Sequence, residues 1–188
     1  MITGNTLTRD AGAAILSQTT IDTPIGRMYA LASESALCAL EFDGPGRRSR
    51  LERRLRRWFP PHVVEDRESP ILARTRAWLA DYFAGTSADS SAVPLEMHGA
   101  EFERRVWRVL LQIPPGETCS YGSIARQLST IGASRAVGLA NGANPIAIIV
   151  PCHRVIGSSG SLTGYGGGLH RKTWLLDHEK RWRADQLF

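Results

Sequence analysis

Cysteine and lysine are scarce in this sequence of 188 residues. It has only three cysteines, Cys38, Cys119 and Cys152, and no two of them are spaced as Cys-x-x-Cys. An odd and low count does not suit the disulfide framework of a secreted protein, nor a zinc site built from clustered thiolates. At least one thiol must therefore be free, which fits a reducing compartment, and we expect a cytoplasmic protein.

Long apolar segments are also missing. The longest apolar run, residues 146–150, is far shorter than the roughly 18 residues that cross a bilayer. The N-terminus has no charged head followed by a long apolar stretch, so it does not look like a secretion signal. Hydrophobic residues still make up 43% of the chain, enough for a buried core. We expect one medium-sized domain or two small ones, and no membrane partner.

Basic residues outnumber acidic ones, and the excess is uneven along the chain. The 23 basic residues include only two lysines, and with 18 acidic residues they give a net charge of +5. Twelve basic and 11 acidic residues precede Pro94, whereas 11 basic and 7 acidic residues follow it. The surplus lies in the C-terminal half, which is where a polyanion such as a nucleic acid would bind.

The N-terminal half has the pattern of a small sheet with two helices. Residues 1–17 show no periodicity and are expected to form a flexible extension. Short β-prone segments separated by turn residues then predict an antiparallel meander over residues 19–22, 27–32 and 37–42. Apolar residues at helical spacing predict helices at 47–57 and 69–83.

The first of these helices carries seven arginines and one glutamate. A patch that binds a polyanion and a solvated helix face are both compatible with this run, and the solvated face is the commoner use. We therefore expect these arginines to face solvent. Residues 85–94, rich in Ser, Ala and Asp, are expected to link a domain at 18–90 to a second domain at 95–188.

The C-terminal half is predicted to be mainly helical. A helix at 100–112 is stopped by two prolines, and short helices at 121–128 and 134–141 are joined by a tight turn. Such a pair is a helix-turn-helix candidate. The predicted fold class is α+β, with an N-terminal antiparallel sheet and helices followed by this helical domain.

The second helix of the pair has an unusual surface, because its residues are small at alternate positions. Its two polar side chains are Arg135 and Asn141. A helix of this kind can pack closely inside the domain or approach an outside surface closely, and the sequence leaves both uses open.

The passage around Cys152 carries the strongest chemical signal. A thiol reacts as its thiolate, so its pKa of about 8.5 must be lowered or a base must lie nearby. His153 is a candidate base, although neighbours on an extended chain point apart and contact would need a turn or a bridging water. Arg154 adds positive charge, and Glu179 on a predicted helix at 169–182 could orient the histidine. By itself a Cys-His pair is more often structural.

The residues Ile149-Val150-Pro151-Cys152-His153-Arg154-Val155 resemble the active-site signature of the O6-alkylguanine-DNA alkyltransferases, the methylated-DNA–protein-cysteine methyltransferases. The resemblance covers most of the C-terminal half and the N-terminal half only loosely. Its further motifs are Phe102 with Val106-Trp107, Ile113-Pro114 with Gly116, Tyr121-Gly122, Arg135-Ala136-Val137-Gly138, Asn141 with Asn144-Pro145, Leu162-Thr163-Gly164-Tyr165, Trp174-Leu175-Leu176 and His178-Glu179.

The resemblance implies a catalytic role for five residues. Cys152 would accept an alkyl group from O6 of guanine, and from O4 of thymine, in a single irreversible turnover. His153 would take the thiol proton through a bridging water and would be held by Glu179. Tyr121 would donate a hydrogen bond to the base, and Asn144 would brace the turn that carries the site.

The resemblance also implies how alkylated duplex DNA is held. The base would be flipped out of the helix, with Arg135 filling its place in the stack. The small-residue helix would lie in the minor groove through Ser134, Ala136, Gly138 and Asn141, together with Tyr121. The pocket for the everted base would be lined by Val155, Ser158, Ser159, Tyr165 and Gly166.

A ribonuclease H-like N-terminal domain and a winged-helix-like C-terminal domain are the folds that the resemblance implies. It further implies a monomer that can bind DNA cooperatively, without a cofactor. Some members of the family hold a structural zinc in the N-terminal half, but Cys38 alone cannot reproduce that site, so we expect no metal. Two other functions stay open at this point: a non-catalytic DNA-binding module, and a cysteine hydrolase that uses Cys152, His153 and Glu179.

Overall fold

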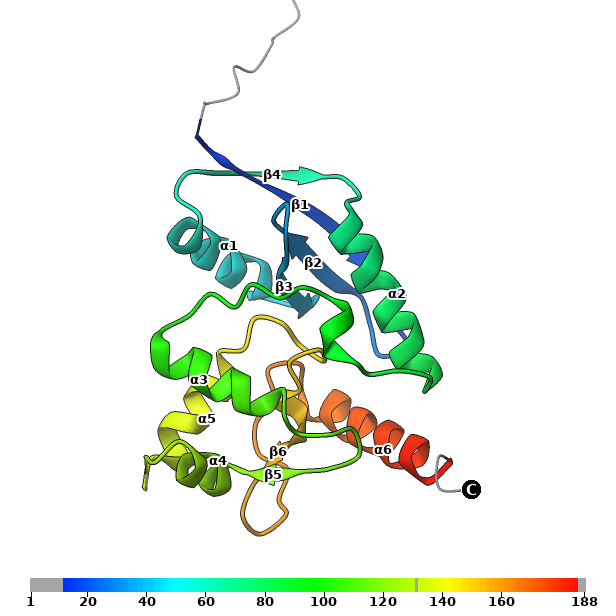
Figure 1. The fold of residues 1–188 in the computed structure, drawn as a ribbon, viewed down its shortest axis with the longest axis vertical. Coiled ribbons are helices and arrows are strands. Elements are labelled where there is room, and N and C mark those ends of the chain that lie inside the picture. The colour runs from blue at the N-terminus through cyan, green and yellow to red at the C-terminus, as the bar shows by residue number, and fades with distance from the viewer. Residues whose placement is uncertain (1–11, 131, 186–188) are drawn as a thin grey trace, which may run out of the picture.

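Figure 1 shows a computed structural model, which describes residues 12–130 and 132–185. A sheet with helices α1 and α2 forms the upper half of the view, and helices α3 to α6 form the lower half. This arrangement confirms the predicted α+β class. Residues 1–11 of the predicted flexible extension lie outside the described part of the chain.

The sheet contains the predicted meander and one strand that was not predicted. Strands β1 (Ala14–Ile21), β2 (Met28–Ala32) and β3 (Leu37–Phe42) pair antiparallel in chain order, as expected. The extension was placed too far along the chain, because β1 begins at Ala14. Strand β4 (His62–Asp66) pairs parallel to β1 at the edge, so the sheet is mixed rather than purely antiparallel. Strand β4 was missed because its sequence is polar, its Val63 is exposed, and it shows no alternation of apolar and polar residues.

Helices cover both faces of the sheet. Helix α1 (Arg47–Trp58) places Leu51 and Leu55 in a small core against Leu16 and Leu31. Helix α2 (Pro70–Ala84) packs on the strands from the other side. The Ser69 hydroxyl caps α2 by accepting a hydrogen bond from the backbone N–H of Leu72, which is the usual role of serine at this position.

All the arginines of α1 were expected to face solvent, but three of them do not. Arg47, Arg50 and Arg54 turn toward the carboxylate of Glu41, which is 3% exposed on β3. Arg54 and Arg50 lie 2.9 and 3.1 Å from its oxygens, and Arg47 lies 3.9 Å away. A buried carboxylate is stable only when it is paired, which explains the inward turn. The expected solvated face is made by Arg48, Arg53, Arg56 and Arg57.

The C-terminal half contains the predicted helix pair. Its helices are α3 (Glu101–Leu110), α4 (Tyr121–Gln127), α5 (Ser134–Gly142) and α6 (Leu169–Asp185). A 3-10 turn, η1 (Ser90–Ala92), precedes them, and another, η2 (Cys152–Arg154), carries the candidate site. Short parallel strands β5 (Cys119–Ser120) and β6 (Val155–Ile156) join the start of α4 to the end of η2. None of the described helices is long and apolar enough to cross a membrane.

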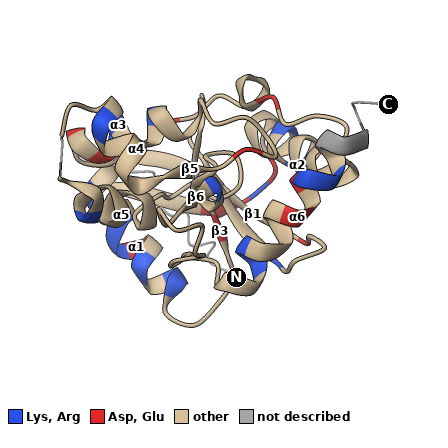
Figure 2. Cartoon of the chain, turned by 90° about the horizontal axis from the view of Figure 1, so that it is seen from below, with Lys and Arg blue, Asp and Glu red and all other residues tan. Residues whose placement is uncertain are grey.

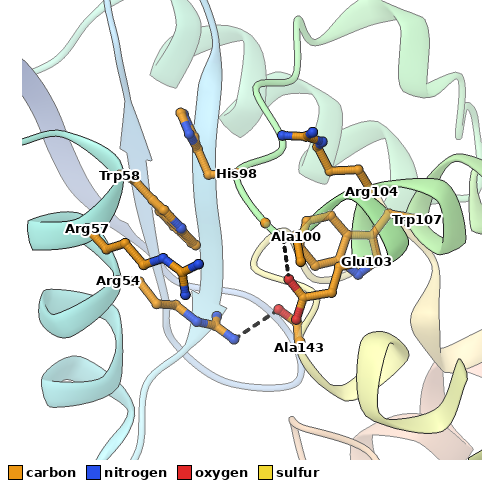
Figure 3. A pocket seen from close by; sticks show the side chains of 10 residues that line it. Arg54, Arg57, Trp58, His98, Ala100, Glu103, Arg104, Trp107 and Ala143 are labelled. Atoms are coloured by element: carbon orange, nitrogen blue, oxygen red, sulfur yellow. Dashed lines mark hydrogen bonds between the residues drawn. The ribbon is translucent and has the colours of Figure 1, made fainter. Parts of the chain in front are cut away.

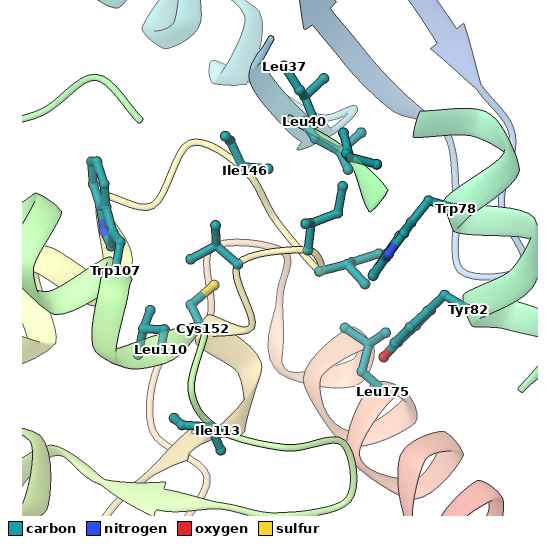
Figure 4. Packing of buried hydrophobic residues seen from close by; sticks show 14 of the residues in the cluster. Leu37, Leu40, Trp78, Tyr82, Trp107, Leu110, Ile113, Ile146, Cys152 and Leu175 are labelled. Carbon is teal, nitrogen blue, oxygen red and sulfur yellow. The ribbon is translucent and has the colours of Figure 1, made fainter. Parts of the chain in front are cut away.

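The two halves share one hydrophobic core, shown in Figure 4. It runs from Leu40 on β3, past Trp107 on α3, to Leu175 on α6. Backbone hydrogen bonds reinforce this contact, since Leu40 exchanges bonds of 2.9 and 2.8 Å with Pro145 and Ala147. The predicted linker is also packed: the carbonyl of Pro94 accepts a bond of 2.8 Å from Leu37. The sheet therefore supports the segment that leads to Cys152.

Replacing Leu40 with alanine should test this shared core. Leu40 is fully buried at the contact between the halves, so we expect a loss of about 2–5 kcal/mol in the free energy of unfolding. Val63, which is 49% exposed, provides the control, and Val63→Ala should change stability by about 0.5 kcal/mol or less. Urea denaturation measures both, and equal effects would contradict the assignment of the core.

Candidate active site

A tight turn at residues 144–152 positions Cys152. The Asn144 amide donates to the carbonyls of Val150 and Ile146 at 2.8 and 3.3 Å, and its oxygen accepts from the N–H of Ile146 at 3.0 Å. Ile148 has a φ of +70°, a conformation that β-branched residues rarely adopt. The hydrogen bonds of Asn144 fix the backbone of this turn, and they therefore fix the position of Cys152 at its end.

Glu179 on α6 receives hydrogen bonds from four residues in three parts of the chain. His153 Nε2 lies 2.8 Å from its Oε1, and both side chains are fully buried. Arg154 donates to the carboxylate at 2.9 Å from Nε and at 2.8 Å from Nη2. The Tyr82 hydroxyl, from α2, donates at 2.7 Å, and the backbone N–H of Gly116 donates at 3.1 Å. The predicted contact between His153 and Glu179 is therefore present.

Two of these partners were not expected. Tyr82 is fully buried, but its position in the N-terminal half gave no signal that it would reach Glu179. Arg154 was expected to place its charge beside the thiol. Instead its guanidinium is occupied by Glu179 and the carbonyl of Ile113. The physical reason is the burial of Glu179, which requires a cationic partner.

The protonation states follow from burial and from these contacts. Burial alone would raise the pKa of Glu179, but hydrogen bonds and charges from His153 and Arg154 hold it well below its usual value. Burial lowers the pKa of His153 despite its contact with Glu179. Burial raises the pKa of the Cys152 thiol, against hydrogen bonding from Asn144 and the charge of Lys172. At neutral pH the site therefore holds a thiol, a neutral imidazole and a carboxylate.

The imidazole is oriented to accept a proton. Since Nε2 faces the carboxylate, its proton belongs on that nitrogen, and Nδ1 carries the lone pair. Nδ1 is buried and has no hydrogen-bond partner among the described residues. The arrangement can thus take a proton at Nδ1 and stabilise the resulting imidazolium through Glu179.

Cys152 is 6% exposed and lies on a narrow cavity of about 20 Å³, room for about one water molecule. Two of the five residues predicted for the pocket, Tyr165 and Gly166, line this cavity. Val155 is instead buried in the core, and Ser158 and Ser159 are exposed. The last two lie in a turn closed by hydrogen bonds among residues 157–161, which carries them away from the thiol.

The N-terminal half also contributes to this cavity, which the sequence did not indicate. Glu41, Phe42, Arg47 and Arg50 line it beside Cys152. These residues reach the site because β3 and α1 approach the glycine-rich loop, residues 157–168, at the cavity. We found no pattern in the sequence that could have shown it.

A second cavity, of about 270 Å³, lies between α1 and α3 (Figure 3). Arg54 donates to the carbonyl of Ala143 at its base, and Glu103 accepts from the N–H of Ala100. It contains no thiol or other strong nucleophile among its lining residues.

Helices α4 and α5 present the predicted surface with one exception. Ser134, Arg135 and Ala136 are exposed, and Tyr121 packs beside Gly138. Asn141 is 4% exposed and donates to the carbonyl of Cys152 at 3.3 Å, so it belongs to the interior and not to the outer face of α5. Figure 2 shows basic residues on α1, α3 and α5 along one side of the molecule.

The sequence suggested that Cys38 has no potential metal ligand near it, but the structure places two beside it. Its sulfur lies within 4.8 Å of potential ligand atoms of Glu96 and His98. Burial raises the pKa of the Cys38 thiol to about 11. The thiol donates to Glu96 at 3.6 Å, and Nε2 of His98 lies 2.9 Å from the other oxygen of the same carboxylate. The absence of a metal stays a prediction.

The fold and the site together define a class of protein. A helix pair with an exposed arginine adjoins a buried cysteine, and the next residue along the chain belongs to a histidine–carboxylate pair. This combination suits group transfer to a thiol from a ligand held by the helix pair.

Comparisons with known proteins identify the family. Residues 16–97 match the model of the 6-O-methylguanine DNA methyltransferase ribonuclease-like domain, and residues 101–181 match that of its DNA-binding domain. A methylated-DNA–protein-cysteine methyltransferase of Mycolicibacterium paratuberculosis is 47% identical over 86% of this chain and 91% of its own length. One from Salmonella typhimurium is 44% identical over 85% and 92%.

Solved structures agree. The crystal structure of Mycobacterium tuberculosis O6-methylguanine methyltransferase is 45% identical, with a TM-score of 0.74 over 88% of this chain and 93% of that one. The structure of M. tuberculosis OGT in complex with DNA is 44% identical, with a TM-score of 0.73 over 89% and 94%. The chain belongs to the methylated-DNA–protein-cysteine methyltransferase family, and it repairs DNA by direct transfer of an alkyl group to a cysteine of its own.

Replacing Glu179 with glutamine should expose the importance of the buried network. The change leaves Arg154 without its carboxylate, and breaking a buried pair costs about 3–5 kcal/mol. The folded pKa of Glu179 lies below its ordinary value of 4.5, so its charge stabilises the fold above that pH and this contribution is lost on acidification. Urea denaturation between about pH 7 and pH 3 should show lower stability and a shallower acid decline in the variant.

The control is Glu52→Gln, because Glu52 is exposed and its pairing with Arg48 is a surface contact. It should change stability by less than about 1 kcal/mol. If the free energy of unfolding depends on pH in the same way in wild type and Glu179→Gln, the ionised carboxylate does not stabilise the fold.

Proposed function

We propose that Cys152 is the alkyl acceptor and that His153 and Glu179 relieve it of its proton. The observation that supports this most directly is the contact of 2.8 Å between His153 and Glu179, next to a cysteine that lines a cavity. The thiol proton passes through a water molecule to Nδ1 of His153. Glu179 stabilises the imidazolium that forms, in the manner of a general base with an orienting carboxylate.

The transfer is an in-line displacement. The sulfur of Cys152 bonds to the carbon attached to O6 of guanine, or to O4 of thymine, as the bond from carbon to that oxygen breaks. The electron pair remains on the base, which takes up a proton and leaves neutral, with Tyr121 as the hydrogen-bond donor. The thioether has no path back to a thiol, so each molecule reacts once.

The burial of Cys152 supports base flipping. A volume of about 20 Å³ cannot hold a purine, so the residues that line the cavity must move apart when the base enters. A base inside a duplex cannot present its alkyl group to a buried sulfur. We infer that the nucleotide turns out of the stack and that the exposed Arg135 takes its place.

The exposed surface of α5 supports binding in the minor groove of duplex DNA. Its small outer residues, Ser134 and Ala136, allow close approach to the groove, and Tyr121 packs beside Gly138. Contacts to phosphates would provide most of the affinity, so binding should weaken with salt. All the proposed catalytic groups lie on one chain, which is compatible with a monomer that binds DNA cooperatively. The three free cysteines are compatible with a cytoplasmic location.

Replacing Cys152 with alanine should abolish transfer and leave DNA binding within about twofold, because the thiol is buried and contacts to phosphates provide most of the affinity. The measurement is the intact mass of the protein after incubation with duplex DNA that contains O6-methylguanine. Wild type and the control variant Cys119→Ala should each gain one methyl group, and peptide mapping should place it on Cys152.

A methyl group on the Cys152→Ala protein would move the acceptor to another cysteine. A wild type that binds the duplex without gaining mass would indicate a non-catalytic DNA-binding module. Turnover of an ester without a lasting mass change would indicate a cysteine hydrolase.

Replacing Arg135 with alanine should slow repair in a duplex by about tenfold or more, because flipping costs a few kcal/mol that the inserted side chain offsets. The reaction with free O6-benzylguanine should not change, since no base is extruded. Single-turnover rates on both substrates measure this, with Arg108→Ala on the exposed side of α3 as the control. Equal losses on the two substrates would contradict the role given to Arg135.

A further inference from the structure

The first turn of α6 is tied to the N-terminal half of the chain through Arg171. We propose that Arg171 is a positioning residue that holds two walls of the Cys152 cavity together and thereby controls how often the thiol can be reached. One wall is Phe42 on β3, and the other is the backbone around Gly167 in the glycine-rich loop. This inference rests on the proposed function, because it concerns access to the same thiol.

The guanidinium of Arg171 bridges the two halves of the chain. Its Nε donates to the carbonyl of Ile25, in the turn between β1 and β2, and its Nη1 donates to the carbonyl of Gly167, each at 2.7 Å. Hydrogen bonds from a charged donor are stronger than those between neutral groups. Ile25 belongs to the N-terminal half and Gly167 to the loop, so at least one of the two bonds must break if the walls separate.

The same guanidinium lies over the ring of Phe42, with Cζ 4.6 Å from the ring centroid. A cation at this distance from an aromatic face is attracted to it. Phe42 is fully buried and lines the cavity that contains Cys152. Arg171 therefore contacts the first wall through this ring and the second wall through the carbonyl of Gly167.

Two glycines allow these parts to pack closely. A Cβ placed on Gly167 would lie only 2.9 Å from Cδ2 of Phe42, so the loop backbone rests directly on the ring. A Cβ placed on Gly26 would lie 2.8 Å from Nη2 of Arg171, so the turn backbone rests on the guanidinium. The turn, the guanidinium, the ring and the loop therefore form one closely packed contact.

The next residue anchors the loop in a different way. Lys172 donates to the carbonyls of Thr163 and Val155 at 2.8 and 2.6 Å, and both of these partners belong to the C-terminal half. Its hydrogen bonds can persist while the walls of the cavity separate. Those of Arg171 cannot all persist, so the closing contact across the cavity depends on Arg171.

Closure of the cavity limits the reactivity of Cys152. The residue is 6% exposed and its cavity has room for about one water molecule, so a larger reagent reaches the sulfur only when the walls separate. The rate of modification then follows the equilibrium between the closed and open forms. Removal of Arg171 should favour the open form and speed modification. The loss of its positive charge would act in the opposite direction, because it would disfavour the thiolate.

The test measures the alkylation of each cysteine by iodoacetamide, a small neutral reagent, with peptide mapping by mass spectrometry. In Arg171→Met, Cys152 should be alkylated about tenfold faster, the scale expected for the loss of one charge-assisted hydrogen bond. The rates at the partly exposed Cys119 and the fully buried Cys38 should not change. Arg181→Met, on the exposed side of the same helix, is the matched control and should leave all three rates as in wild type.

Alkylation of Cys152 in Arg171→Met at or below the wild-type rate would overturn the proposal. A parallel rise at Cys38 would also overturn it, because it would show a general loss of folding. Methyl transfer from duplex DNA that contains O6-methylguanine is measured in wild type alongside. Its absence would refute the proposed function, whereas its presence together with an unchanged alkylation rate in Arg171→Met would refute only the inference about Arg171.

Discussion

The buried carboxylate of Glu179 is the interaction on which the site depends. It is fully buried and receives hydrogen bonds from His153, Arg154, Tyr82 and the backbone of Gly116. An ionised carboxylate in such surroundings persists only while its partners are in place. The same contacts that stabilise the charge also fix the orientation of the imidazole, so the fold and the proton acceptor are supported by one group.

Tyr82 connects this network to the N-terminal half. Its hydroxyl donates to the same oxygen that His153 contacts, and its ring stacks on Trp78 in the shared core. The sheet adds a second connection, because β3 pairs with the backbone on either side of Ile146. The ribonuclease-like half is therefore part of the active site's structure, although the nucleophile and the helix pair both lie in the other half.

The resting site balances reactivity against stability. Burial keeps the thiol protonated and the imidazole neutral, so no thiolate–imidazolium pair has to be maintained in the resting site. The charges of Lys172 and Arg47 favour the thiolate and are already present in the resting site, where burial opposes them.

Local patterns in the sequence determined most of the secondary structure and pointed to the candidate reactive residues. The meander, both N-terminal helices and the helix pair follow from alternation, helical spacing and turn residues, which act over a few positions. The motif around Cys152 identified the candidate nucleophile and base, and spacing on the last helix pointed to Glu179.

Contacts between distant segments decided the rest. Strand β4 is defined by its pairing with β1, and the inward turn of Arg47, Arg50 and Arg54 depends on a carboxylate on another element. Tyr82 contacts Glu179 although the two lie 97 positions apart in the sequence. The amide of Asn141 points inward and donates to the backbone carbonyl of Cys152. Periodicity reports which face of an element is apolar, but the partners of a buried charge are set only when the chain has folded around it.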